Sequence, residues 1–171
     1  MAKSILVSIL IIFSAALVES TILVNLYILP VIPDLVLIVC VYLSLLNGKT
    51  YGQLSGFVSG IILDSITGVP FGLNCIFRTI SGYIYGLFAN HIVITGFIVP
   101  VLTVGSATLL KALLIKFIAL FYTAINPVEI ISIDFLIELI FNMALSPFIF
   151  KFLQFFKKTL SIHPEHNSLN V

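Results

Sequence analysis

Long apolar stretches follow one another along the whole chain, and only short polar or turn-forming groups separate them. The breaks read "LPVIPD", "NGK", "TGVPFG", "NH" and "NP", and such residues end helices. An apolar helix of about 20 residues crosses the ~30 Å hydrocarbon core of a bilayer, so the pattern predicts six membrane spans. The expected spans are about 4–24, 35–46, 51–66, 73–89, 96–122 and 131–152. The second and third are short and are expected to tilt, or to lie where the bilayer thins.

Composition agrees with a membrane protein, because 60% of the residues are hydrophobic and only 9% are charged. A soluble domain carries about 25% charged residues. We therefore predict an all-α, polytopic protein with one transmembrane domain over 1–158 and a flexible cytoplasmic tail over 159–171. The opening "MAKSILVSILIIFSAALVES" also has features of a signal peptide. Since the chain beyond it is equally apolar, a first span is the simpler interpretation.

The basic residues predict how the chain is oriented in the membrane. Lysines at the predicted cytoplasmic side are Lys3, Lys49, Lys151, Lys157 and Lys158. The segments around 25–33, 67–71 and 123–130 contain neither lysine nor arginine. Cytoplasmic loops are enriched in both residues, so six spans with both termini in the cytoplasm are expected.

Eight further charged residues fall in the outer half of the predicted bundle. They are Glu19, Asp34, Asp64, Arg78, Lys111, Lys116, Asp134 and Glu138. Each costs at least ~2.5–3.5 kcal/mol in hydrocarbon, so we expect these side chains to face the interior and pair. We predict that Asp64 pairs with Arg78 or with a lysine of the fifth span. Two interpretations stay open: a polar cavity that receives a solute, lipid headgroup or partner helix, and an ion-pair cluster that holds the helices in register.

Glycine recurs every fourth residue in "GKTYGQLSGFVSG", at Gly48, Gly52, Gly56 and Gly60. Small residues let transmembrane helices approach closely, so this row predicts a groove on the third span. The run "GYIYG" (82–86) offers a matching face on the fourth span. The groove is interpreted either as an internal packing seam, which we favour, or as a docking groove for another protein. Docking of a partner protein is a stronger alternative at Gly48 and Gly52 than at the other two glycines, because both are expected near the cytoplasmic surface.

Catalytic chemistry has little support in the sequence. Asp34 and Asp64 are a candidate carboxylate pair, but no HExxH, GxSxG or Asp-rich metal motif accompanies them. Cys40 and Cys75 lie in apolar segments without metal-ligand spacing, and His91 falls in an expected loop. We therefore expect no catalytic or metal residue, no cofactor and no nucleic-acid partner.

The pattern G-x-x-x-G-x-x-x-D-x-x-x-G-x-x-x-G in "GFVSGIILDSITGVPFGLN" (56–74) follows "IPDLVLIVCVYLSL" (32–45). With the terminal "NMALSPFIFKFLQFFKK" (142–158), it resembles the bacterial rod-shape-determining protein MreD family over essentially the whole chain. By position, the family motif falls on Pro33, Asp34, Gly56, Gly60, Asp64, Gly68 and Gly72. Arg78 departs from the family pattern.

The resemblance implies a non-enzymatic component of the peptidoglycan elongation machinery in the cytoplasmic membrane. It implies association with MreC, and through MreC with MreB, the glycosyltransferase RodA and a class B penicillin-binding protein. It also implies a fold similar to the six-helix substrate-binding subunit of energy-coupling-factor vitamin transporters. Such a substrate-capture subunit is the main alternative function, because a polar cluster in the outer half suits a ligand pocket too. An intramembrane enzyme is the third possible function.

Overall fold

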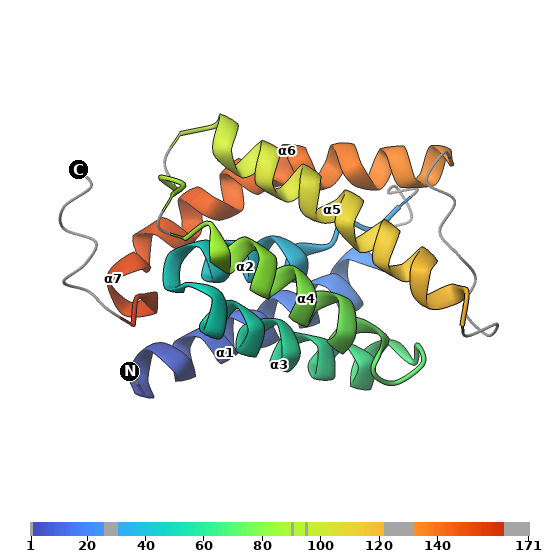
Figure 1. The fold of residues 1–171 in the computed structure, drawn as a ribbon, viewed down its shortest axis with the longest axis horizontal. Coiled ribbons are helices and arrows are strands. Elements are labelled where there is room, and N and C mark those ends of the chain that lie inside the picture. Colours follow the sequence, from blue (N-terminus) through green and yellow to red (C-terminus); the bar gives the residue numbers. More distant parts are fainter. Residues whose placement is uncertain (1, 26–30, 90, 95, 122–131, 163–171) are drawn as a thin grey trace.

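The computed structural model describes residues 2–25, 31–89, 91–94, 96–121 and 132–162, which form helices and contain no strand (Figure 1). The elements are α1 (Ala2–Leu17), η1 (Val18–Leu23), α2 (Leu35–Asn47), α3 (Lys49–Thr67), α4 (Leu73–Leu87), α5 (Ile98–Ala119), α6 (Ile133–Phe155) and α7 (Lys157–Leu160). The π-helical segment η1 continues α1 directly. The predicted all-helical class is confirmed, and α1 with η1 and α2 to α6 coincide with the six expected helical segments to within a few residues.

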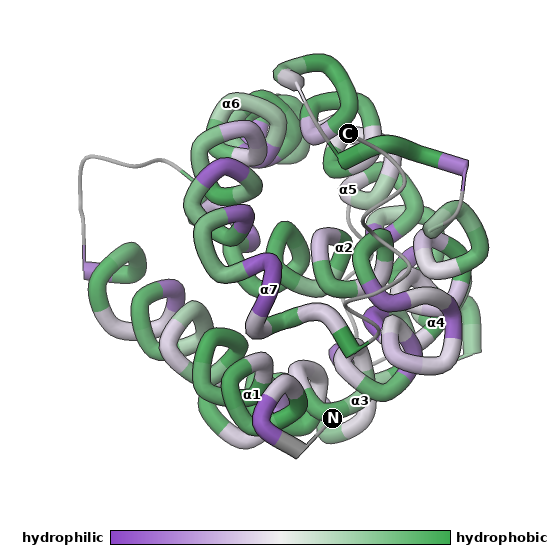
Figure 2. Tube along the Cα trace, turned by 90° about the vertical axis from the view of Figure 1, so that its left-hand side faces the viewer, coloured by the Kyte–Doolittle hydropathy of each residue, from purple (hydrophilic) through white to green (hydrophobic). Residues whose placement is uncertain are grey.

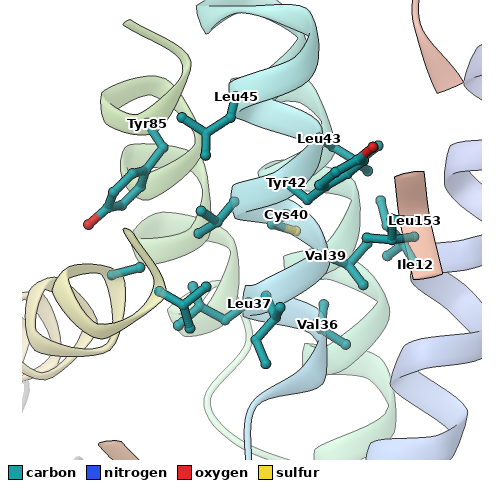
Figure 3. Packing of buried hydrophobic residues seen from close by; sticks show 14 of the residues in the cluster. Ile12, Val36, Leu37, Val39, Cys40, Tyr42, Leu43, Leu45, Tyr85 and Leu153 are labelled. Carbon is teal, nitrogen blue, oxygen red and sulfur yellow. The ribbon is translucent and has the colours of Figure 1, made fainter. Parts of the chain in front are cut away.

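Helix α2 is the centre of the molecule. It contacts α1, α3, α4, α5 and α6, and Figure 2 shows it enclosed by these helices. Every residue from Val36 to Leu45 is buried, which is expected of a helix that is apolar on all sides. Its side chains meet Ile12 of α1, Tyr85 of α4 and Leu153 of α6 in one hydrophobic cluster (Figure 3). The helix therefore packs against protein on every side.

Edge-to-face aromatic contact adds to this core. The Tyr42 ring on α2 lies 5.2 Å from the Phe150 ring on α6, centroid to centroid, with an interplanar angle of 77°. Such pairs contribute ~0.5–1.5 kcal/mol beyond the area they bury. The contact fixes the C-terminal half of α6 against α2.

Three helical stretches of the described residues are long and apolar enough to cross a membrane: Lys3–Leu23, Ile98–Ala119 and Ile133–Phe155. Helix α2 is apolar but has only 13 residues, about 20 Å of rise, which is less than the hydrocarbon thickness. Helix α4 has 15 residues, and α3 carries glycine and serine on its packing face. By length and composition, three of the six expected spans are therefore supported. Helices α2 and α4 are shorter than a span, and α3 is more polar.

The beginning of α1 and helix α7 lie at the same end of the molecule (Figure 1). Asn47, the last residue of α2, binds α7 and the residues after it: its Oδ1 accepts from the Ile162 N–H at 2.9 Å, and its Nδ2 donates to the Leu160 carbonyl at 3.1 Å. The Ser4 hydroxyl donates to the Ser161 carbonyl at 3.2 Å. Leu160 is fully buried. The start of the C-terminal segment is thus part of the bundle.

This finding corrects the predicted tail. The sequence predicts a flexible segment over 159–171, but residues 159–162 pack on the bundle because Leu160 is apolar and Asn47 satisfies the backbone beside it. Residues 163–171 lie outside the described residues, as do most of the predicted outer loops at 25–33 and 123–130.

We expect Thr50 and Val69, at opposite ends of α3, to lie on opposite sides of the membrane. In right-side-out membrane vesicles, a membrane-impermeant maleimide should label Val69→Cys and leave Thr50→Cys unlabelled until the vesicles are lysed. Both positions are exposed, whereas native Cys40 and Cys75 are 2% and 7% exposed and should react slowly. Labelling of Thr50→Cys in intact vesicles would contradict the orientation predicted from the lysines.

Candidate functional site

The glycines of α3 lie against the backbone of α4. A Cβ atom built on Gly52 would lie 2.2 Å from the Gly82 carbonyl oxygen, and one on Gly56 2.2 Å from the Arg78 carbonyl oxygen. One on Gly60 would lie 2.4 Å from the Cys75 Cα. Contacts this short are not compatible with any side chain. Close backbone approach of this kind is how transmembrane helices associate without a hydrophobic driving force.

The fourth helix supplies the opposing face. A Cβ on Gly82 would lie 2.0 Å from the Gly52 carbonyl oxygen, and one on Gly86 2.4 Å from the Lys49 Cα. The "GYIYG" run therefore lies where the sequence places it, along the glycine row of α3. Within the described residues, α4 fills the groove at Gly52, Gly56 and Gly60, so these positions are not open to a partner protein.

Gly48 does not belong to this groove. It ends α2 with φ +88°, its N–H donates to the Ser44 carbonyl at 2.9 Å, and a Cβ there would meet nothing within 4 Å. The prediction of a four-glycine row is wrong at this position, because Gly48 provides the left-handed backbone of the turn between α2 and α3.

Asp64 holds the loop between α3 and α4. Its carboxylate accepts hydrogen bonds from the Gly72 N–H at 2.8 Å, the Asn74 N–H at 3.0 Å and the Asn74 Nδ2 at 2.9 Å. These donors belong to the beginning of α4, whose first N–H groups have no partner within the helix. Asp64 therefore caps α4 from the preceding helix. The predicted pairing of Asp64 with Arg78 or a lysine is wrong.

The two loop glycines of the motif have a conformational role. Gly68 ends α3 at φ +68° and Gly72 precedes α4 at φ +101°, and neither would meet an atom within 4 Å if it carried a Cβ. Residues other than glycine rarely adopt these angles. The motif thus combines two packing glycines, one capping carboxylate and two turn glycines.

Asp34 is the centre of the intramembrane charges. One carboxylate oxygen accepts from Arg78 Nη2 at 2.8 Å and also from the Leu37 N–H at 2.8 Å, which caps α2. The other oxygen lies 2.9 Å from Lys111 Nζ. Arg78 is 1% and Asp34 3% exposed, so the pair is fully desolvated. Pro33 precedes this site and is buried.

Further contacts extend the cluster to the other long helices. Lys111 also lies 2.6 Å from a Glu138 carboxylate oxygen, which brings in α6. The Asp34 N–H donates to Asn142 Oδ1 at 2.8 Å, and Asn142 Nδ2 donates to Thr108 Oγ1 at 3.1 Å. Side chains from α4, α5 and α6 therefore converge on the beginning of α2.

Glu19 approaches the same place from η1. Its carboxylate accepts from the Val36 N–H at 3.1 Å, so a second acidic side chain binds the first turn of α2. Insertions of π-helix shift the facing of side chains and recur at functional sites. Here the π-helical turn carries Glu19, whose carboxylate reaches the first turn of α2.

Besides Asp64, two predicted members of the cluster lie outside it. Lys116 and Asp134 are exposed and form no ion pair with any residue that the structure describes. Asn142 and Thr108 are members that charge alone did not reveal. The signal was an uncharged polar side chain within an apolar helix, such as the Asn in "NMALSPFIF", which must find a partner in hydrocarbon.

The cluster has the chemistry of a structural ionic network. The charges of Asp34 and Glu138 balance those of Arg78 and Lys111, and three ion pairs join the four side chains in a row: Arg78 to Asp34, Asp34 to Lys111, and Lys111 to Glu138. The described residues contain no group of three or more His, Cys, Asp or Glu side chains with the geometry to hold a metal ion. The structure supports the second interpretation of the charges, an ion-pair cluster that sets helix register.

We expect Gly60→Ala to destabilise the protein by about 1–3 kcal/mol, because the new methyl group meets the Cys75 backbone. Gly105→Ala is the matched control on α5: its Cβ would meet only the flexible Met143 side chain, at 3.1 Å. We expect a change within about 1 kcal/mol there, because alanine also favours the helix. The free energy of unfolding in detergent micelles is measured for both variants. Equal destabilisation of the two would contradict a close packing of α4 against Gly60.

Asp34→Asn should destabilise the protein by about 3–5 kcal/mol, because it leaves buried Arg78 without a carboxylate and removes one of the two carboxylates that bind Lys111. Asp134→Asn removes the same charge from an exposed site and should change stability by less than about 0.5 kcal/mol. The same unfolding assay compares them. An Asp34→Asn protein as stable as the control would show that the cluster does not depend on this carboxylate.

Comparison with known families now bears on these motifs. Searches of curated proteins and of solved structures returned no significant match. The family model described as rod shape-determining protein MreD matches residues 1–156, which include the glycine seam, the Asp64 cap and the Asp34 cluster. The chain therefore belongs to the MreD family of rod shape-determining membrane proteins.

Proposed function

We propose that this protein is a non-enzymatic scaffold of the peptidoglycan elongation machinery, bound to an MreC-like protein in the bacterial cytoplasmic membrane. MreB, RodA and a class B penicillin-binding protein are expected to associate indirectly. The observation that carries the proposal is the match of the MreD family model over residues 1–156, since that family acts in rod-shape determination. We further propose six spans with both termini in the cytoplasm.

The contacts of the polar residues support a scaffold. Asp34 and Glu138 both bind Lys111, and Asp64 binds the backbone at the beginning of α4. The glycine groove is filled by α4. A partner helix is therefore expected on the outer, apolar faces of the bundle. Helix Lys3–Leu23 offers the most such surface, because 17% of its apolar window is buried against 44% for Ile98–Ala119.

A substrate-capture subunit of an energy-coupling-factor transporter, whose six-helix fold the resemblance implies, is the alternative. One observation favours it: Arg78 Nε and Nη1 are buried and have no hydrogen-bond partner among the described residues. A polar ligand would supply the missing acceptors. Substitutions that keep the cluster folded but alter its charge separate this alternative from a scaffold.

Glu19→Gln and Glu138→Gln keep the acceptor oxygens that bind the Val36 N–H and Lys111 and remove one negative charge each. In cells that lack their own copy, we expect both variants to restore rod shape and to co-purify with the MreC-like protein in mild detergent. Gly60→Ala is the comparison, because there loss of fold should remove partner binding and shape together.

Two outcomes would contradict the proposal. The wild-type protein failing to co-purify with the MreC-like protein would argue against the scaffold. A Glu19→Gln protein that folds and retains its partner, yet leaves the cells round, would assign the cluster a ligand-binding or catalytic role.

A further inference from the structure

A hollow of about 300 Å³ lies between the beginning of α5 and the end of α6. Gly96, Phe97, Pro147, Phe150, Lys151 and Gln154 line it. Its walls are mostly apolar, whereas Lys151 and Gln154 give it one polar side. Gln154 Nε2 donates to the Ile94 carbonyl at 2.6 Å, which fixes that side in place. The hollow is separate from the Asp34 cluster and takes no part in it.

Lys151 is exposed and forms no ion pair with a described residue. The other lysines at this end of the bundle likewise form no ion pair with a described residue. Those lysines are Lys3, Lys49, Lys157 and Lys158. Figure 2 looks onto this end and shows hydrophilic residues on α7. The acidic residues of the described chain lie at the opposite end, beside η1, the beginnings of α2 and α6, and the end of α3. Among the described residues, this end therefore carries positive charge that no acidic side chain compensates.

Large exposed apolar side chains belong to a lining residue, Phe97, and to the sequence neighbours of lining residues, Ile98 and Phe148. Phe97, Ile98 and Phe148 are 65%, 69% and 70% exposed. In a membrane protein such side chains meet acyl chains. The first turn of α5, which follows Phe97, has no side-chain cap, and the positive end of a helix favours an anion. An occupant that satisfies all these features has a negative headgroup joined to an apolar chain.

We propose that the hollow binds an anionic phospholipid of the surrounding leaflet, with its phosphate at Lys151 and an acyl chain along Phe97 and Phe148. Basic pockets between transmembrane helices at the cytoplasmic side bind such headgroups in this way. The site would tie the end of α6 to the beginning of α5 through a lipid. The proposal does not depend on the scaffold function.

The chain contains no tryptophan, so Phe97→Trp creates a single fluorescent reporter in the wall of the hollow. We expect brominated phosphatidylglycerol to quench it with about a fivefold higher binding constant than brominated phosphatidylcholine of the same chain length, in mixed vesicles. One lysine near a membrane surface supplies about that ratio.

In the reporter background, Lys151→Gln should abolish the preference and Lys151→Arg should keep it. Lys158→Gln is the matched control, because it removes the same charge at the same end but does not line the hollow. It should leave the preference unchanged. Native mass spectrometry of the tryptophan-free Lys151→Gln and Lys158→Gln proteins gives a second measurement that does not depend on the reporter folding.

Equal quenching by the two lipids would overturn the proposal and would leave the hollow to a protein partner. An equal loss of preference in Lys151→Gln and Lys158→Gln would also overturn it, since the attraction would then be a diffuse property of the basic end. Retained phosphatidylglycerol adducts in Lys151→Gln by mass spectrometry would do the same.

Discussion

The carboxylate of Asp34 holds the bundle together at the point where α2 begins. It accepts from Arg78 of α4 and lies beside Lys111 of α5, while its own backbone N–H donates to Asn142 of α6. Among the described residues, Asp34 is the one ion-pair partner of buried Arg78, which would be costly to leave unpaired, whereas Lys111 also pairs with Glu138. The rotation of three helices about their axes is therefore tied to one residue. Because α2 is the central helix, the packing of the others around it depends on the same interaction.

The hairpin of α3 and α4 meets a second constraint by different means. Its two helices approach until backbone meets backbone at Gly56 and Gly60, so no side chain fits between them. Close approach of this kind demands that the connecting loop turn sharply, and Gly68 and Gly72 provide the positive φ angles. Asp64 then binds the first N–H groups of α4. A regular spacing in the sequence thus contains residues selected for three separate physical reasons.

Charge is distributed unequally between the two ends of the molecule. At one end, Asp34 and Glu138 pair with Arg78 and Lys111, while Glu19 and Asp64 accept hydrogen bonds from backbone N–H groups. At the other end, Lys151 and its neighbouring lysines form no ion pair with a described residue, and their charge is left for the surroundings. The same asymmetry that predicts orientation therefore also makes one end of the bundle a suitable surface for anionic lipid.

The sequence by itself determined the helices and the close seam, because both depend on local properties. Apolar runs and turn residues predict where a helix begins and ends, and glycine spacing predicts that a helix face is flat. The pairing of the charged side chains does not follow from such local properties. Asp34 and Asp64 are both expected at the outer end of their segments, so the sequence was compatible with an ion pair between Arg78 and either of them. Depth along a span can be estimated from residue number, but the direction of a side chain depends on how each helix is rotated and crossed. Only the tertiary structure decided that Arg78 binds Asp34, that Asp64 caps α4, and that Asn142 and Asn47 join segments more than 100 residues apart.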